Sequence, residues 1–98
     1  MSAYAIANYR ITNPDGYGDY PQLALQTILS HGGEVLVADF DSEVLDGSPG
    51  HVTVVGRFAS KEAVKGWYES DEYQQIKHLR TDNSEGFLTV CDELVMPS

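Results

Sequence analysis

The strand-forming segments of this chain carry apolar side chains at both odd and even positions. Over residues 3–11 every odd position is apolar, and Tyr4 and Ile6 add apolar surface at the even positions. In a later segment Phe58 alternates in the same way with Val55. Successive side chains of a strand point to opposite faces of the sheet. A sheet built from these segments therefore has two faces that avoid water, and each face needs a cover.

The predicted elements follow the order β-α-β-β-α-β. Alternating or β-branched composition predicts strands over residues 3–11, 34–39, 52–58 and 87–95. Apolar residues at helical spacing predict one helix before the second strand and another before the fourth. This order is that of the ferredoxin-like class. We therefore expect one α+β domain over residues 1–98, with a four-stranded antiparallel sheet and two helices on one face.

The first helix has two alternative starts. It could begin at Pro14 and bend around Pro21, or it could begin close to Tyr20. Its end is predicted at His31-Gly32-Gly33, because glycine is the usual left-handed cap of a helix.

The second helix carries two candidate N-caps. Ser60 precedes Lys61-Glu62, and Ser70 precedes Asp71-Glu72. A serine followed by acidic residues is typical of a first turn. We therefore expect this helix to start at Ser60, to restart at Ser70 and to continue through Arg80.

Two helices can cover only one face of a four-stranded sheet. The other face, left uncovered, would expose a large apolar patch to water. Covering it is favourable, because burial of apolar surface stabilises by about 25 cal/mol per Å². A second copy of the sheet is the simplest cover, which predicts a homodimer through the sheet face, a dimeric α+β barrel. The alternative is a monomer whose second face is kept half polar by Thr53, Arg57, Thr89 and Asp92.

Charge and composition exclude several classes of partner. Fifteen acidic and six basic side chains give a formal net charge of −9, whereas nucleic-acid binding needs clustered Lys and Arg. No stretch approaches the roughly 20 apolar residues that cross a bilayer, so no membrane partner is expected. The first residues lack the pattern of a secretory signal, and Cys91 is the only cysteine, so we expect a cytoplasmic location. Cys91 itself is expected to pack as a small core residue.

Residues that could bind metals or act as nucleophiles are scattered. His31, His51 and His78 lie far apart, without His-x-x-x-His or Cys-x-x-Cys spacing. There is no Gly-x-Ser-x-Gly run, and Gly32-Gly33 is a helix cap rather than a phosphate loop. We therefore expect neither a metal site nor a cofactor.

A series of residues in these elements resembles a known family. The series consists of Tyr20, His31-Gly32-Gly33, Asp46-Gly47, Phe58, the run from Trp67 to Tyr73, and Arg80. Together they resemble the domain-of-unknown-function family 1330, within the dimeric α+β barrel superfamily. The Trp-Tyr-x-Ser-x-x-Tyr run with a following arginine is the most specific part. The resemblance spans nearly the whole chain and implies the ferredoxin-like fold and the barrel-forming dimer, but no common activity.

The chain departs from the family's pattern after the second strand. A basic residue is common there, whereas Ala38-Asp39 stand at this point of the chain. An anion-binding role is therefore not expected at that position.

Superfamily relatives often bind small molecules between the sheet and its helices, and the resemblance implies such a site here. The candidate binding residues are Asn8, Arg10, Tyr20, Trp67, Tyr73 and Arg80. Trp67 offers a large apolar wall, the tyrosines offer hydroxyl groups, and Arg80 offers a planar fork that matches a carboxylate. This mixture suits an oxygen-bearing or aromatic small molecule.

Each candidate also has a structural interpretation. The aromatic residues are typical of the buried stripe of a helix. Arg80 could pair with Asp71, with Glu72 or with the carboxyl end of a helix. His31 could be a cation at a helix end or a solvent-facing residue.

Two functions remain as hypotheses. Superfamily relatives include cofactorless oxygenases, isomerases and dehydratases, which implies a cofactor-independent enzyme acting on a small carbonyl-containing or aromatic compound. In that enzyme His31 or Tyr73 would serve as acid or base, and Arg80 would hold the anion of the substrate. The alternative is a non-catalytic homodimer that binds a small molecule or has a structural role. A wet pocket where Arg80 and a histidine converge would favour the enzyme, and a dry cleft filled by Trp67 and Tyr73 would favour the alternative.

Overall fold

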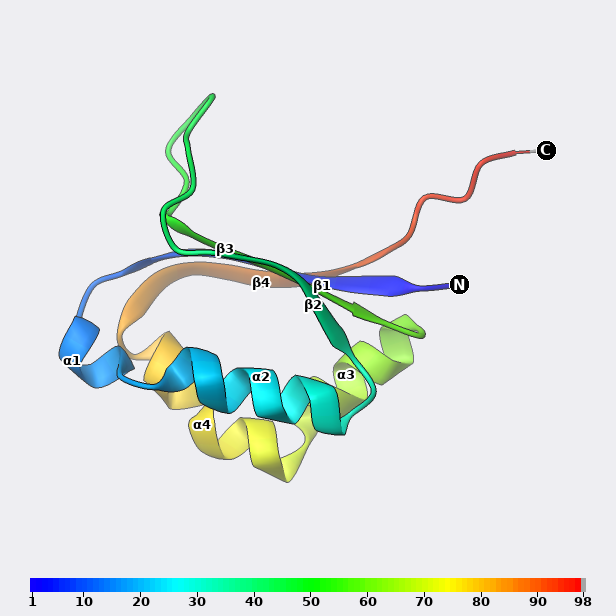
Figure 1. Cartoon of the computed structure of the whole chain (residues 1–98), viewed down its shortest axis with the longest axis horizontal. Coiled ribbons are helices and arrows are strands. Elements are labelled where there is room, and N and C mark those ends of the chain that lie inside the picture. Colours follow the sequence, from blue (N-terminus) through cyan, green and yellow to red (C-terminus); the bar gives the residue numbers. More distant parts are fainter. Residues whose placement is uncertain (98) are drawn as a thin grey trace.

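One antiparallel sheet and the helices on one side of it account for nearly all regular structure in a computed structural model that describes residues 1–97 (Figure 1). The elements are β1 (Ala3–Ile11), α1 (Pro14–Tyr17), α2 (Tyr20–Ser30), β2 (Glu34–Asp39), β3 (Val52–Phe58), α3 (Lys61–Glu69), α4 (Asp71–Thr81) and β4 (Ser84–Asp92). The strand order is β2-β3-β1-β4, and every neighbouring pair is antiparallel. The predicted ferredoxin-like α+β fold is confirmed.

The first helical region combines the two predicted starts. A short helix, α1, begins at Pro14, and a separate helix, α2, begins at Tyr20 with Pro21 in its first turn. The break falls at Gly18, whose φ of 53° is a left-handed conformation that interrupts a helix. The helical path therefore does not bend around Pro21, because proline fits the first turn of a new helix without losing a hydrogen bond.

The predicted glycine cap is found at the end of this region, and the predicted serine caps are found in the next one. Gly32 has a φ of 79°, and the N–H of Gly33 donates to the carbonyl of Ile28 at 2.9 Å, which closes the end of α2. Ser60 accepts a hydrogen bond from the N–H of Ala63 at the start of α3. Ser70 does the same at the start of α4, so the predicted restart is confirmed.

The last strand lies three residues earlier than predicted. It was expected over residues 87–95, but β4 spans Ser84–Asp92. The reason is its pairing with β1, in which Ile11 faces Ser84 and Ala3 faces Asp92. The length and position of β1 therefore fix the bounds of β4, and beyond them Glu93 makes one more backbone contact, from its N–H to the carbonyl of Ser2 at 2.9 Å.

The two faces of the sheet have different surroundings. The odd positions of β1 from Ala3 to Tyr9 are buried against the helices, together with Val52 and Phe58 of β3. The opposite face carries no helix among residues 1–97; Figure 1 shows only the loop between β2 and β3 and the C-terminal segment on that side. We call this surface the bare face. Tyr4, Ile6, Val55 and Phe87 lie on it.

Cys91 also lies on the bare face. It was expected to pack as a core residue, but it is exposed and faces Tyr4 across the β1–β4 pair. The strand register explains the error, because residues two apart share a face, and Cys91 shares its face with Phe87 and Thr89 rather than with buried side chains.

Membrane insertion by a helix finds no support in the part of the chain that the structure describes. Within residues 1–97, no helix combines the length and the apolar character that a bilayer crossing requires.

Candidate functional site

A cavity of about 450 Å³ lies between α2 and the sheet. Small residues on four elements contribute to its lining: Ala5 and Ala7 of β1, Ala24 of α2, Ala38 of β2 and Gly56 of β3. Protein interiors are normally close-packed. Where small side chains face one another across the helix and sheet layers, space remains. We call this space the α2 cavity.

The α2 cavity has an apolar opening and a polar inner end. Leu25 and Phe40 line it and are exposed, so the cavity opens between α2 and the end of β2. The inner end is formed by Tyr9, Tyr17, Tyr20 and Arg80, and Trp67 forms part of the wall. A space of this size, with apolar walls and a few convergent polar groups, is typical of a small-molecule site.

Arg80 reaches the cavity from α4 and is the one buried charged side chain of residues 1–97, with 7% of its surface exposed. Its Nε donates a hydrogen bond to the hydroxyl oxygen of Tyr73 at 3.3 Å. The guanidinium also interacts with the Tyr20 hydroxyl, but neither Nη nitrogen has the full geometry of a hydrogen bond to residues 1–97. No side-chain nitrogen there is both sealed from solvent and unpartnered. The outer edge of the guanidinium therefore keeps some accessible surface.

No carboxylate of residues 1–97 forms an ion pair with Arg80. The predicted alternatives, Asp71 and Glu72, are exposed at the opposite end of α4. A buried cation without a counter-ion is costly. This site therefore holds a positive charge that an anionic group on a ligand would neutralise.

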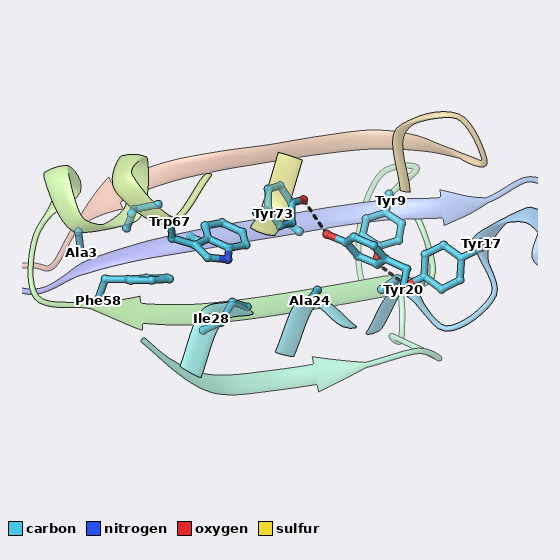
Figure 2. Close-up of a cluster of buried hydrophobic side chains, with 13 residues drawn as sticks. Ala3, Tyr9, Tyr17, Tyr20, Ala24, Ile28, Phe58, Trp67 and Tyr73 are labelled. Atoms are coloured by element: carbon cyan, nitrogen blue, oxygen red, sulfur yellow. Dashed lines mark hydrogen bonds between the residues drawn. The ribbon is translucent and has the colours of Figure 1, made fainter. Parts of the chain in front are cut away.

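Hydrogen-bonded pairs of phenols surround this cation. The hydroxyls of Tyr20 and Tyr73 are 2.7 Å apart, and so are those of Tyr9 and Tyr17, as the dashed lines in Figure 2 show. Burial raises the pKa of Tyr9, Tyr17 and Tyr20, and the positive charge of Arg80 only partly opposes that effect. These phenols are neutral at physiological pH and can donate or accept hydrogen bonds.

Opposing influences act on Arg80 itself. Burial lowers its pKa, but interactions with Tyr73 and Tyr20 raise it, and the net direction is upward. The guanidinium therefore stays charged. A permanent cation beside neutral hydroxyls is suited to binding an oxyanion.

Trp67 is held rigidly in the wall of the cavity. Its indole Nε1 donates to the hydroxyl oxygen of Thr27 at 3.0 Å, and 3% of its surface is exposed. Its ring centroid lies 4.4 Å from that of Tyr73 and 5.6 Å from that of Phe58. A fixed indole gives an aromatic ligand a flat apolar surface.

Of the predicted site residues, Tyr20, Trp67 and Arg80 come together as lining of the α2 cavity. Tyr73 lies behind this lining, fully buried, and acts on the cavity through its hydrogen bonds to Tyr20 and Arg80. These four residues come from α2, α3 and α4.

Asn8 and Arg10 do not reach the cavity. Both occupy even positions of β1, so they point to the bare face, whereas the cavity is lined by odd positions. Asn8 ties the chain after the β2–β3 loop to β1, because its Oδ1 accepts from the N–H of Gly50 at 2.7 Å and its Nδ2 donates to the carbonyl of Val52 at 3.1 Å. Arg10 is exposed and paired with Glu85.

His31 also lies outside the cavity lining. It follows the last residue of α2, where its Nδ1 is 2.9 Å from the carbonyl oxygen of Thr27 and its Nε2 is 3.8 Å from a carboxylate oxygen of Glu72. The helix end thus directs the imidazole along α2 toward α4. This position agrees with the structural interpretation of His31 and separates the histidine from Arg80.

Two lining residues, Tyr9 and Tyr17, were not predicted as site residues. Tyr9 shares the odd face of β1 with the alanines of the cavity. That alternation was visible in the sequence and could have assigned Tyr9 to the inner face. Tyr17 carried no such signal, because its place depends on the break at Gly18.

The chemistry available in the α2 cavity is that of binding and oxyanion stabilisation. Among residues 1–97 its lining includes no Asp, Glu, His, Lys or Cys. Because the phenols also hold their protons, no side chain of the lining is a general base at neutral pH. The site can hold an anionic, apolar molecule between Arg80 and Trp67.

Comparison with known proteins gives one family and several structural relatives. The sequence profile described as "Domain of unknown function (DUF1330)" matches residues 2–94. No curated protein matches the chain. A protein of unknown function from Rhodopseudomonas palustris superimposes with a TM-score of 0.71 at 15% identity, over 97% of this chain and 84% of that one.

Two further relatives are candidate antibiotic biosynthesis monooxygenases. The protein from Caulobacter crescentus superimposes with a TM-score of 0.62 at 12% identity, over 96% of this chain and 91% of that one. The protein from Nitrosomonas europaea has a TM-score of 0.59 at 10% identity, over 94% and 90%. At these identities the likeness establishes a shared ferredoxin-like α+β fold and nothing about the reaction.

Proposed function

This chain belongs to the DUF1330 family, and from that premise we propose that it binds a small aromatic or otherwise apolar compound with one carboxylate in the α2 cavity. The apolar body of the ligand lies against Trp67 and the alanines of the sheet. Its carboxylate pairs with the outer edge of the Arg80 guanidinium. The hydroxyl of Tyr20 supplies a further hydrogen bond.

One observation carries this proposal: a buried arginine that has no counter-ion among residues 1–97 lies at the inner end of an apolar cavity. The chain has fifteen acidic residues, yet none of those in residues 1–97 forms an ion pair with Arg80. A ligand carboxylate would make two charge-assisted hydrogen bonds with the fork. A neutral analogue would leave this cation unpaired, so the proposal predicts selectivity for anions over neutral analogues.

Quenching of the fluorescence of Trp67, the single tryptophan, by 2-naphthoate and by the neutral 2-naphthamide tests the proposal. We expect 2-naphthoate to bind about tenfold more tightly, because only the carboxylate forms charge-assisted hydrogen bonds with Arg80. In Arg80→Met that preference should disappear. Equal affinities of the wild-type chain for the two compounds would refute the proposal.

Arg57→Met is the matched control for Arg80→Met. Arg57 is exposed on the bare face and paired with Glu34, so its loss changes the net charge equally without touching the cavity. It should keep the preference for 2-naphthoate. Because Arg80 is buried, Ala5→Leu serves as a second variant that obstructs the cavity and leaves the arginine in place.

A catalytic role for the same cavity is the second candidate. The outer edge of Arg80 and the hydroxyl of Tyr20 converge where the oxygen of an enolate would be stabilised. Since no lining side chain is a base, the α-proton of a carbonyl substrate would leave to water. This is the cofactor-independent reaction on a small carbonyl-containing or aromatic compound, with Arg80 as the catalytic residue in place of His31.

Exchange of the α-protons of phenylpyruvate in D2O distinguishes catalysis from binding. The substrate loses a proton to solvent, forms the enolate and takes up deuteron from D2O, which NMR follows directly. A rate increase that Arg80→Met removes and Arg57→Met keeps would support the enzyme. Binding of 2-naphthoate without any increase in exchange would favour a non-catalytic binding protein.

We also propose that the bare face pairs with a second copy of the chain. Ile6, Val55 and Phe87 form an apolar centre on that face, and two ion pairs, Arg57–Glu34 and Arg10–Glu85, flank it. An apolar centre with a polar rim is the usual composition of a protein interface. The two-fold pairing would make the chain a homodimer with a closed barrel between the sheets.

A further inference from the structure

A second cavity, of about 370 Å³, lies between α3, the end of α4 and the edge strand β4. Its lining consists of Val64, Lys65, Trp67, Tyr68, Arg80, Thr81 and residues 86–90. We call it the β4 cavity. It is separate from the α2 cavity, although Arg80 and Trp67 contribute to the walls of both.

The basic residues of the chain divide into two groups of three. Of the six, three form ion pairs with carboxylates: Arg10 with Glu85, Arg57 with Glu34, and Lys61 with Asp92. The other three, Lys65, Lys77 and Arg80, form no ion pair with a carboxylate of residues 1–97.

Two of these three cations belong to the lining of the β4 cavity, and the third is next to it. Lys65 and Arg80 line it directly, and Lys77 contacts the lining residue Tyr68. The lining contains no acidic residue among residues 1–97. In a chain with more than twice as many acidic as basic side chains, cations usually find carboxylate neighbours. Their concentration around one cavity without such neighbours indicates a site for an anion.

Tyr68 holds Lys77 in position. The ammonium nitrogen lies 5.2 Å from the centroid of the Tyr68 ring and 3.5 Å from its hydroxyl oxygen. Lys77 is half-buried, so the cation–π contact replaces part of its lost hydration. The lysine is therefore kept beside the cavity rather than extended into solvent.

The remaining lining offers both apolar and hydroxyl surface. Val64, Trp67 and Leu88 provide apolar walls, and Thr81 and Thr89 provide hydroxyl groups. An ammonium group is a compact point charge with three donors, which suits the several oxygens of a phosphate. Apolar walls of this extent suit an organic body attached to that phosphate.

We propose that the β4 cavity binds a small organic phosphate monoester, with Lys65 and Lys77 at its phosphate group. The ester's apolar body lies between Trp67 and β4. This site does not depend on the carboxylate proposal for the α2 cavity, because neither lysine lines that cavity.

Titration of the 15N-labelled full chain with phenyl phosphate, followed by amide chemical shifts, tests the proposal. We expect saturable shifts at residues 64–68, 80–81 and 86–90. In Lys65→Gln/Lys77→Gln the dissociation constant should rise about tenfold or more, because two charge-assisted contacts are lost. The same double variant should keep its affinity for 2-naphthoate, so the two cavities are tested separately.

Lys61→Gln/Arg10→Gln is the matched control. It removes the same charge, but both residues form ion pairs and neither lines the β4 cavity. It should bind phenyl phosphate with nearly unchanged affinity. Equal weakening in the two double variants, or no saturable shift at residues 86–90, would overturn the proposal. Equal affinities for phenyl phosphate and inorganic phosphate would refute the claim that an organic group of the ligand binds in the β4 cavity.

Discussion

The two faces of the sheet are made by the same strands, yet they differ in the size of their apolar side chains and in what covers them. On the helix side, β1 presents Ala3, Ala5 and Ala7, and the helices lie over them. On the bare face the same strand presents the larger side chains Tyr4 and Ile6, and no helix of the described part of the chain covers that face. Small residues under the helices leave a cavity, whereas the larger residues of the bare face form the surface that we propose pairs with a second copy of the chain.

From this contrast we infer that the two faces have different roles. The helix side encloses the space in which Arg80 has no counter-ion from the described residues, and we assign ligand binding to it. The bare face carries its charges as surface ion pairs around an apolar centre, and we assign self-association to it. Substitutions that affect one face and leave the other unchanged test this division.

The largest effect is expected at the centre of the bare face. Ile6→Asp should raise the dissociation constant of the dimer about a hundredfold or more, because the two-fold interface would have to bury two unpaired carboxylates, one from each protomer. Sedimentation velocity over a range of concentrations measures this change. A wild-type chain that stays monomeric at all concentrations would refute the pairing itself.

The control for Ile6→Asp is Gln75→Asp, which adds the same charge to an exposed position of α4. It should leave the dissociation constant nearly unchanged. Cys91 gives an independent readout, because its exposed thiol lies on the bare face. A thiol reagent should label it more slowly in the dimer than in Ile6→Asp.

A smaller effect, on the free energy of unfolding, is expected when the same alanine-to-leucine substitution is made at two positions of β1 on the helix side. Ala3 is fully buried and does not line the α2 cavity, so Ala3→Leu should lower the free energy of unfolding by about 1–3 kcal/mol through overpacking. Ala5 lines the cavity, so Ala5→Leu should have room and change stability by less than about 1 kcal/mol. Urea denaturation measures both. Equal losses of unfolding free energy at the two positions would mean that the α2 cavity has no room for a leucine side chain.

The smallest effect is expected from alkaline titration of the buried phenols. Burial raises the pKa of Tyr20, so the folded chain keeps a proton that the unfolded chain loses above its ordinary pKa of about 10. The contribution to stability is complete below that pH and is lost as the pH rises above it. In Tyr20→Phe the free energy of unfolding should fall less as the pH rises, and at a pH of about 10.5 its loss should be smaller by about 0.8 kcal/mol than in the wild-type chain. An identical pH dependence of unfolding in the two chains would contradict this.

Most of the fold could be predicted from local patterns. Alternation gave the bounds of β1 and β3, a β-branched run gave those of β2, and the serine caps gave the restart of the second helix. These signals depend on residues close together in the chain. The bounds of β4 could not be obtained in this way. They depend on hydrogen bonds to β1, more than seventy residues away in sequence.

The candidate site was predicted in part. The family resemblance placed Tyr20, Trp67 and Arg80 in the space between helices and sheet, and all three line the α2 cavity there. Asn8 and Arg10 were wrongly directed there, although the period of two in a strand already separated them from the inner face. His31 was considered for its chemistry alone, and its position at the end of α2 removes it from the cavity.

The sequence by itself determined the order of the elements, the two-sided apolar character of the strands and the excess of negative charge. Only the tertiary structure decided where space remains and which cations lack a partner. The reason is that a cavity and an ion pair both depend on distances between residues remote in sequence, such as Ala5, Ala24 and Gly56 around the α2 cavity. Even Asp71, nearby in sequence, lies about 13 Å along the helix axis from Arg80, because a helix rises about 1.5 Å per residue.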